Sequence, residues 1–269
     1  MDIAPIVGGA NDIETVSGYD GSGVRAVVFD NGLFLYEQFD AVPPIVMTNN
    51  FSTSHGTSVY GTAFASGDPD PQYRGIIPEE QGSFATFFGL DRPAPTAELV
   101  DPAGPYRVVF QTSSWGGSRT TENTPTSAEL DQILFDYDIL TLQSQSNAGS
   151  RQSRPEAWAN NAVSIGCFNH NNNTDPSDDA WAGTASIGPG DDGRIKPDLS
   201  FWYDSTDTTS NYAGPYRTVG GTSGATPLTA GYFGLFFEMW AYGVFEGTPG
   251  LNRDVFDSRP HACTQSLSH

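Results

Sequence analysis

Basic residues are scarce in this sequence, which has 12 Lys and Arg against 32 Asp and Glu among its 269 residues. Lys196 is the only lysine. The formal net charge of −20 would repel the phosphate backbone of DNA or RNA, so we expect no nucleic-acid partner. The acidic residues are scattered along the chain, which favours a solubilising surface over a dedicated cation site.

Long hydrophobic runs are also missing. No uninterrupted apolar stretch approaches the roughly 20 residues that a membrane-spanning helix needs, so we expect no membrane partner. The first residues lack the basic and apolar regions of an export signal. An acidic composition with little lysine and much Gly, Asn, Ser and Thr is typical of exported proteins. We therefore predict a secreted protein whose signal and pro-segment are absent from this chain.

Cysteine is nearly absent. Cys167 and Cys263 permit at most one intramolecular disulfide, and two cysteines exclude a four-cysteine zinc site. Whether the two residues pair is left open by their number and spacing.

The chain does contain enough apolar residues, 37% of the total, to fill a core. Apolar runs predict strands, and small or periodic apolar patterns predict helices, one of them capped by Ser127. The expected strands are 25–29, 107–112, 139–143 and 162–167, and the expected helices are 55–66, 124–137 and 223–242. Alternating strands and helices predict a three-layer α/β fold with a mainly parallel central sheet and helices on both faces, in one domain over residues 1–269.

A serine with the surroundings of a nucleophile lies at 221–227 (GTSGATP). Ser223 follows a glycine turn and opens a small-residue helix, which exposes its hydroxyl. Pro227 is expected in the first turn of that helix, where its missing N–H costs little. The helix N-terminus also supplies free backbone N–H groups and positive potential to an oxyanion.

The other parts of an acyl-transfer site have candidates as well. His55 opens a second small-residue helix and can act as general base, and Asp30 at the end of its strand can orient the imidazole. Asn147 can offer its side-chain amide to the oxyanion. The other histidines, His170, His261 and His269, have no such surroundings and are expected to be structural.

These segments resemble the subtilisin-like serine proteases, in which Asp, His and Ser follow one another in the order of Asp30, His55 and Ser223. The resemblance is carried by residues 18–32 (GYDGSGVRAVVFDNG), 55–61 (HGTSVYG), 73–78 (YRGIIP), 114–117 (SWGG), 193–198 (GRIKPD) and 221–227, in that order. It implies a serine endopeptidase that acts on protein or peptide substrates. It further implies that Ser114, Trp115 and Gly116 pair with the substrate backbone and that the pro-segment inhibits the enzyme.

No cofactor is required for the chemistry that this resemblance implies, although structural calcium is a candidate. Acidic loops at 68–70 and 175–179 are the places where the sequence offers oxygen ligands. A solvated surface is the simpler interpretation of both loops.

The sequence also departs from the family. Ser58 stands where relatives often have histidine, Tyr60 where they usually have alanine, and residues 146–149 (SNAG) replace a commoner glycine-asparagine pair. The chain ends at His269, soon after the serine helix, where relatives have at least one more helix, so a truncated or processed form is expected.

Two alternatives stay open. A catalytically silent, protease-like module that binds extended peptides has no chemical need to keep Asp30, His55 and Ser223 together. A serine-carboxyl peptidase active at acid pH would carry an acid where His55 stands. The residues 6–9 (IVGG) are similar to the activated N-terminus of the chymotrypsin group, but the serine frame of that group (GDSGG) is absent.

Overall fold

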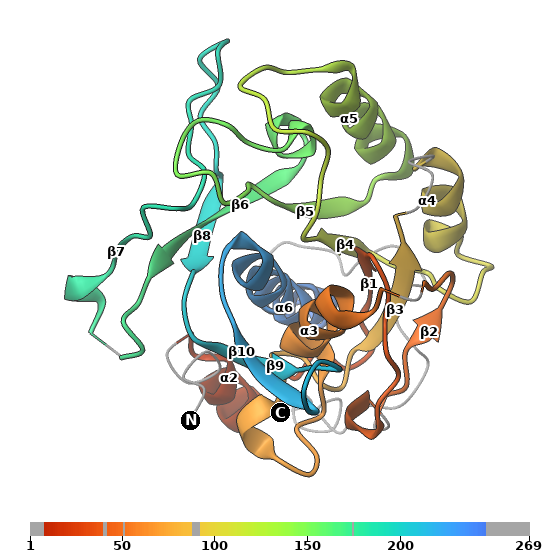
Figure 1. The fold of residues 1–269 in the computed structure, drawn as a ribbon. Helices are drawn as coiled ribbons and strands as arrows, with labels where there is room; N and C mark the ends of the chain where they lie inside the picture. Colours follow the sequence, from red (N-terminus) through yellow and green to blue (C-terminus); the bar gives the residue numbers. More distant parts are fainter. Residues whose placement is uncertain (1–7, 40–41, 51, 88–91, 174, 246–269) are drawn as a thin grey trace.

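The computed structural model describes residues 8–39, 42–50, 52–87, 92–173 and 175–245 (Figure 1). Its strands are β1 (Arg25–Asp30), β2 (Ile45–Val46), β3 (Gln81–Thr86), β4 (Phe110–Ser113), β5 (Leu140–Ser144), β6 (Val163–Asn169), β7 (Ala180–Trp181), β8 (Leu199–Trp202), β9 (Thr206–Thr209) and β10 (Tyr216–Val219). Its α-helices are α2 (Ala10–Ser17), α3 (Ser54–Phe64), α4 (Pro93–Val100), α5 (Pro125–Tyr137) and α6 (Thr222–Ala241). Short 3-10 turns lie at Glu37–Phe39, Pro71–Tyr73, Pro155–Trp158 and Pro176–Asp178.

An eight-stranded sheet forms the centre of the described part of the chain. Its strands follow the order β2-β3-β1-β4-β5-β6-β7, and β8 also pairs with β6. Every pairing is parallel except that of β6 with the short edge strand β7. Strands β9 and β10 form a separate antiparallel ribbon beside α3. The predicted α/β fold with a mainly parallel sheet is therefore confirmed.

The sheet separates two hydrophobic clusters, and β1 contributes to both. Ala26 and Val28 pack in the cluster that includes residues of α3 and α6, whereas Val27 and Phe29 pack in the cluster that includes residues of α4 and α5. Figure 1 shows these two helix pairs on opposite sides of the sheet. Because successive side chains of a strand point to opposite faces, Asp30 falls on the same face as α3 and α6.

Several predicted boundaries move for local reasons. Strand β4 begins at Phe110 rather than at Arg107, because Arg107 has a φ of 52° and cannot continue an extended strand. Helix α5 has Thr124 as its N-cap, and Ser127 accepts the Thr124 backbone N–H at 3.1 Å as the third helical residue of a capping box. The prediction of Ser127 as the cap is therefore wrong.

The region between His170 and Asp192, where the sequence predicts neither a strand nor a helix, contains the edge strand β7 and a short 3-10 turn. No helix among the described residues is long and apolar enough to cross a membrane. The single domain over 1–269 stays a prediction, since it includes residues outside the described ranges.

Candidate active site

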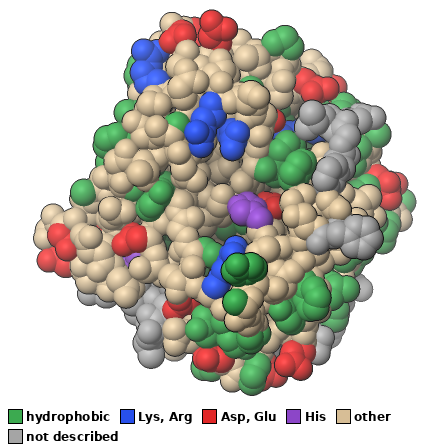
Figure 2. All heavy atoms as spheres, viewed as in Figure 1, with side chains coloured by type: hydrophobic (Ala, Val, Ile, Leu, Met, Phe, Trp, Pro, Cys, Tyr) green, Lys and Arg blue, Asp and Glu red, His purple; other side chains and the backbone are tan. Residues whose placement is uncertain are grey.

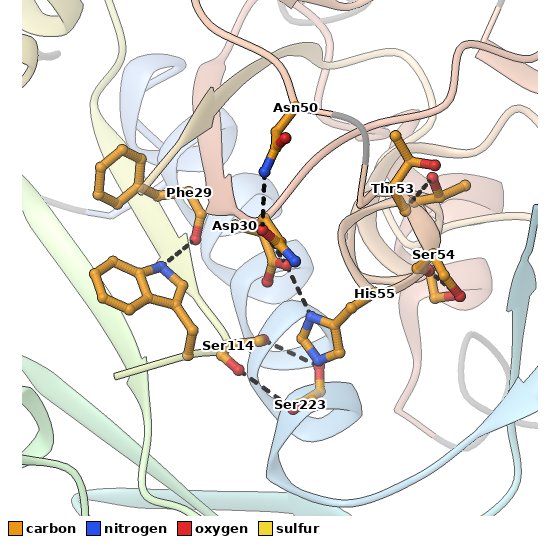
Figure 3. A network of polar contacts seen from close by, with 12 residues as sticks. Phe29, Asp30, Asn50, Thr53, Ser54, His55, Ser114 and Ser223 are labelled. Atoms are coloured by element: carbon orange, nitrogen blue, oxygen red, sulfur yellow. Dashed lines mark hydrogen bonds and ion pairs between the residues drawn. The ribbon is translucent and has the colours of Figure 1, made fainter. Parts of the chain in front are cut away.

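The predicted histidine and aspartate are bonded to each other. The His55 Nδ1 and Asp30 Oδ1 atoms lie 2.8 Å apart, and the same Oδ1 accepts the backbone N–H of Asn31 at 2.7 Å. The Asp30 side chain is 1% exposed and the His55 side chain 44% exposed, so a buried carboxylate holds a ring that reaches solvent. In Figure 3 the His55 ring lies between Asp30 and Ser223. With Nδ1–H donating to Asp30, Nε2 of His55 is left as the proton acceptor.

The close approach of α3 to β1 depends on Gly56. A Cβ atom at this position would lie 2.3 Å from the carbonyl oxygen of Gly32, in the turn that follows Asp30. A larger residue would push the start of α3 away from β1 and lengthen the bond between His55 and Asp30. Gly56 therefore allows the close packing of α3 against the turn after β1, and this packing keeps His55 within bonding distance of Asp30.

The pKa of His55 reflects opposing effects. Burial, the largest single effect, lowers the pKa of His55, and the positive charge of Arg217 also lowers it. The hydrogen bond to Asp30 and the negative charge of that residue together outweigh both, so the pKa of His55 is raised above its ordinary value. The imidazole can therefore both accept and return a proton near neutral pH.

Ser223 lies in the first turn of α6 and lines the same cavity as His55. Its Oγ donates to the carbonyl oxygen of Ser114 at 3.3 Å, and the Oγ of Ser114 donates to the carbonyl oxygen of Ser223 at 3.0 Å. The hydroxyl thus bonds Ser114 rather than the imidazole in this arrangement. A change of the Ser223 rotamer is the movement by which the hydroxyl would reach Nε2, and such catalytic bonds often tighten only with substrate.

Pro227 explains why the carbonyl of Ser223 can accept the bond from Ser114. In an α-helix this carbonyl would receive the N–H of residue 227, and proline has none. Pro227 lies in the second turn of α6, so the prediction of a first-turn proline is wrong. The hydroxyl of Ser114 occupies the acceptor that the proline leaves, and this ties the end of β4 to the start of α6.

Asn147 lies beside the N-terminus of α6. Its Oδ1 accepts the backbone N–H of Thr222 at 3.0 Å and the Thr222 hydroxyl at 3.2 Å. Because Oδ1 faces these donors, the amide NH₂ of Asn147 is free to donate elsewhere. The backbone N–H of Ser223 belongs to the first turn, which has no acceptor within the helix. These two donors make a candidate oxyanion site next to the Ser223 hydroxyl.

The sequence model of the subtilase family matches residues 37–244. The chain belongs to the subtilase family. No curated protein matches it at the level of sequence.

Solved structures show the same fold at low sequence identity. The prenylagaramide maturation protease PagA is 16% identical to this subtilase with a TM-score of 0.68, covering 90% of this chain and 84% of PagA. The self-cleaved protease domain of PatA is 16% identical with a TM-score of 0.66, covering 88% and 86%. The PatG macrocyclase, solved in complex with peptide, is 11% identical with a TM-score of 0.69, covering 90% and 82%.

The loop before Asn147 in this subtilase has an unusual backbone conformation. Ser146 has a φ of 126°, which L side chains rarely adopt. Its buried Oγ accepts the Nε–H of Arg119 at 2.7 Å, and Arg119 also donates to the carbonyl oxygen of Asn147 at 3.2 Å. Sequence analysis missed Arg119, because nothing in its local sequence marks a contact with residues in another loop.

The predicted substrate segment directly follows β4. Trp115 donates its indole N–H to the carbonyl oxygen of Phe29 at 2.7 Å and stacks on Phe87, which fixes the segment against β1. Within the described part of the chain the backbone N–H and C=O of Gly116 have no hydrogen-bond partner. Both groups are therefore available to an extended peptide lying alongside.

The cavity that His55 and Ser223 share has a volume of about 280 Å³ and lies between α3 and β10. Its lining is His55, Ser58, Val59, Thr62, Arg217, Thr218, Val219, Gly220, Ser223 and Gly224. None of Ser114, Trp115 and Gly116 belongs to this lining, so the cavity is distinct from the substrate segment. Figure 2 shows this face of the molecule with a histidine near its centre and basic side chains on either side.

Ser58 and Tyr60, the other two positions that the sequence analysis singled out, are accommodated by packing. The Oγ of Ser58 donates to the carbonyl oxygen of Thr209 at 2.8 Å and accepts the Nε–H of Arg217 at 2.8 Å. Tyr60 is fully buried, with its ring 4.8 Å from the rings of both Phe39 and Phe64. Tyr60 is therefore a core residue within an aromatic cluster.

Metal ligands do not converge anywhere in the described residues, where no three His, Cys, Asp or Glu side chains are grouped for an ion. In the acidic loops that the sequence offered, Asp70 accepts the backbone N–H of Gln72 and Asp175 that of Ser177, so each caps a local turn. Of the two cysteines, Cys167 is buried and free, and Cys263 lies outside the described residues.

Proposed function

We propose that this serine endopeptidase of the subtilase family uses Ser223 as nucleophile, His55 as general base and Asp30 as the residue that orients His55. The amide of Asn147 and the backbone N–H of Ser223 receive the oxyanion. The observation that carries this proposal is the His55 ring, which is bonded to buried Asp30 through Nδ1 and opens with Ser223 into one cavity.

The residues divide the reaction into two steps. Ser223 Oγ attacks the scissile carbonyl carbon while its proton passes to Nε2 of His55, and His55 then gives that proton to the leaving amine as the C–N bond breaks. Water attacks the resulting ester, its proton passes to His55, and the Ser223 oxygen recovers a proton as the acid leaves. Asp30 stabilises the imidazolium in both steps.

The substrate is an extended polypeptide. The unpaired backbone groups of Gly116 support pairing with its acyl half, and the family places protein and peptide substrates at this segment. The structural likeness to PatG, which was solved with a peptide, is consistent with such a substrate. Secretion and inhibition by a pro-segment remain predictions from composition and resemblance. Structural calcium also remains one, and the described residues offer it no ligand cluster.

A fluorophosphonate probe tests the nucleophile directly. The wild-type chain should be labelled covalently and should hydrolyse denatured casein, and Ser223→Ala should lose both properties. Ser177→Ala, in an exposed turn of the 175–179 loop, is the matched control and should retain both. Undiminished labelling of Ser223→Ala would refute the assignment, and labelling without any hydrolysis would favour the peptide-binding alternative.

A further inference from the structure

Arg217 differs in its bonding partners from several other basic residues of this acidic chain. Five of those that the structure describes pair with a carboxylate: Arg74, Arg92, Arg151, Arg194 and Lys196. No carboxylate of the described residues lies within ion-pair distance of Arg217. Its bonds go to neutral oxygens instead, at 2.8 Å from Nε to Ser58 Oγ and at 3.4 and 3.5 Å from the terminal nitrogens to Ser54. The terminal N–H groups therefore keep most of their capacity to bind an anion.

The position of Arg217 is fixed by the same bonds. The short bond to Ser58 fastens the guanidinium to α3, one helical turn beyond His55. Arg217 lines the cavity together with His55 and Ser223, and its charge is close enough to lower the pKa of His55. Among the residues that line the cavity, Arg217 is the only one that carries a permanent charge. A ligand that enters this cavity therefore meets a fixed, unpaired positive charge.

The cavity is open to the leaving half of the substrate, because His55 and Ser223 line it. The acyl half follows the segment 114–116, which does not line the cavity. The departing amine must lie beside His55, because this residue supplies its proton. The first residues after the cleaved bond therefore extend into the space between α3 and β10, where Arg217 lies.

We propose that Arg217 selects substrates whose leaving half carries a carboxylate, most directly an Asp or Glu side chain in the first or second residue after the cleaved bond. Each terminal nitrogen of Arg217 keeps a second N–H besides its long bond to Ser54, and a guanidinium can form paired hydrogen bonds to a carboxylate. The volume of about 280 Å³ accommodates such a side chain. This inference rests on the proposed peptidase function and assigns the leaving-side preference of the same site.

Competition between amines for the acyl-enzyme tests the leaving side without knowledge of the acyl-side preference. The full chain is acylated with a p-nitrophenyl ester, and amines then compete with water for the acyl group, which reverses the leaving step. The release of p-nitrophenol reports acylation, and the ratio of amide to acid product reports amine binding. The amines are the amidated dipeptides Glu-Ala, Gln-Ala and Lys-Ala, together with Gln-Ala bearing a free carboxylate.

Glu-Ala amide should trap the acyl group about tenfold better than Gln-Ala amide, as expected for one charge-assisted bond. Lys-Ala amide should be the poorest of the four amines. Unamidated Gln-Ala carries a carboxylate only at its C-terminus. Its trapping therefore shows whether Arg217 binds a chain-terminal carboxylate as well as a side-chain carboxylate. In Arg217→Gln the advantage of Glu over Gln should disappear, in Arg217→Lys it should be reduced, and in the control Arg151→Gln it should persist.

Equal trapping of Glu-Ala and Gln-Ala amides by acylated wild-type enzyme would overturn the assignment to Arg217 while leaving the peptidase function intact. A full advantage for Glu in Arg217→Gln would overturn it as well. Absence of p-nitrophenol release from the wild type would overturn both, and a fluorophosphonate label on Ser223 distinguishes this case from a poor ester. If Arg217→Gln does not fold, Arg217→Lys takes its place: a reduced advantage of Glu over Gln supports the assignment, and an unchanged advantage would overturn it.

Discussion

Two histidine–aspartate pairs in this molecule have the same bond length and different surroundings. His55 and Asp30 are joined from Nδ1 to Oδ1 at 2.8 Å, and His170 and Asp204 are joined through the same atoms at the same distance. The exposures are reversed, because the His55 side chain is 44% exposed and its aspartate 1%, whereas His170 is 2% exposed and its aspartate 27%.

The free nitrogen of each ring has a different environment. His55 opens with Ser223 into a cavity, whereas His170 is stacked on Trp202 and its buried Nε2 has no hydrogen-bond partner among the described residues. Cys167, near the second pair, cannot serve as a nucleophile there. Burial and, to a smaller extent, the negative charge of Asp204 raise the pKa of its thiol to about 12, so the thiolate does not form at neutral pH. The comparison teaches that a bonded histidine–aspartate pair becomes a general base only where its second nitrogen reaches a nucleophile and solvent.

Substitution of each histidine by alanine should give the largest difference in activity between the two pairs. His55→Ala should lower kcat/KM for a peptide substrate by about 10⁴-fold or more, because the proton of Ser223 loses its acceptor. His170→Ala should leave kcat/KM per folded enzyme unchanged. Steady-state kinetics normalised by near-UV circular dichroism checks both, and a comparable loss in the two variants would remove the functional distinction.

The aspartates provide the next comparison. Asp30→Asn keeps the shape of the side chain but favours the wrong tautomer of His55, so kcat should fall by about 10⁴-fold. Asp204→Asn should retain kcat. Because burial and Arg217 lower the pKa of His55 and Asp30 raises it, the acidic limb of the residual activity of Asp30→Asn should move to lower pH.

Asn147 has no counterpart described beside His170. Its substitution should lower the activity substantially without abolishing it. Asn147→Ala should reduce kcat by about 10²- to 10³-fold with little change in KM, since an oxyanion donor acts mainly in the transition state. Pre-steady-state measurement of acylation checks the step affected. A change confined to KM would indicate that Asn147 binds the ground state instead.

Stability should show the opposite pattern to activity for the two histidines. His170→Ala removes a buried bond to Asp204 and a ring stacked on Trp202, and we expect a loss of about 2–3 kcal/mol in the free energy of unfolding. His55→Ala should cost less, because the His55 ring is more exposed. Urea denaturation followed by tryptophan fluorescence measures both variants.

The smallest expected effect concerns pH. Arg217→Gln removes a charge that lowers the pKa of His55, so that pKa should rise further. The base must be neutral to accept a proton, so the acidic limb of kcat/KM should move to higher pH than in the wild type. A limb that moves to lower pH would show that Arg217 acts on His55 through structure rather than charge.

Much of this site could be predicted from local sequence. The apolar run that ends at Asp30 defines a buried strand, and its alternation places the carboxylate on the face of α3 and α6. The frames around His55 and Ser223 are short and self-contained, so each could be recognised without its partners. The same local patterns placed Pro227 one turn too early, because a helix start is set by hydrogen bonds rather than by composition.

The contacts that could not be predicted join residues far apart in the chain. Arg217 and Ser58 are 159 residues apart, and Arg119 and Ser146 are 27 residues apart in separate loops. An arginine in a loop carries no sign of its acceptor until the packing of the surrounding elements is known. The leaving-side charge and the support of Asn147 therefore depend on tertiary structure alone.

The backbone conformation at Ser146 favours glycine for stability, whereas the hydrogen bond of its side chain favours serine for activity. A φ of 126° costs a residue with a side chain on the order of 1–3 kcal/mol, and glycine would remove most of that cost. Glycine would also release Arg119, whose bond to the Ser146 hydroxyl steadies the neighbouring amide. Directed evolution for thermal stability should therefore favour glycine at position 146. Directed evolution for a high kcat should keep serine there.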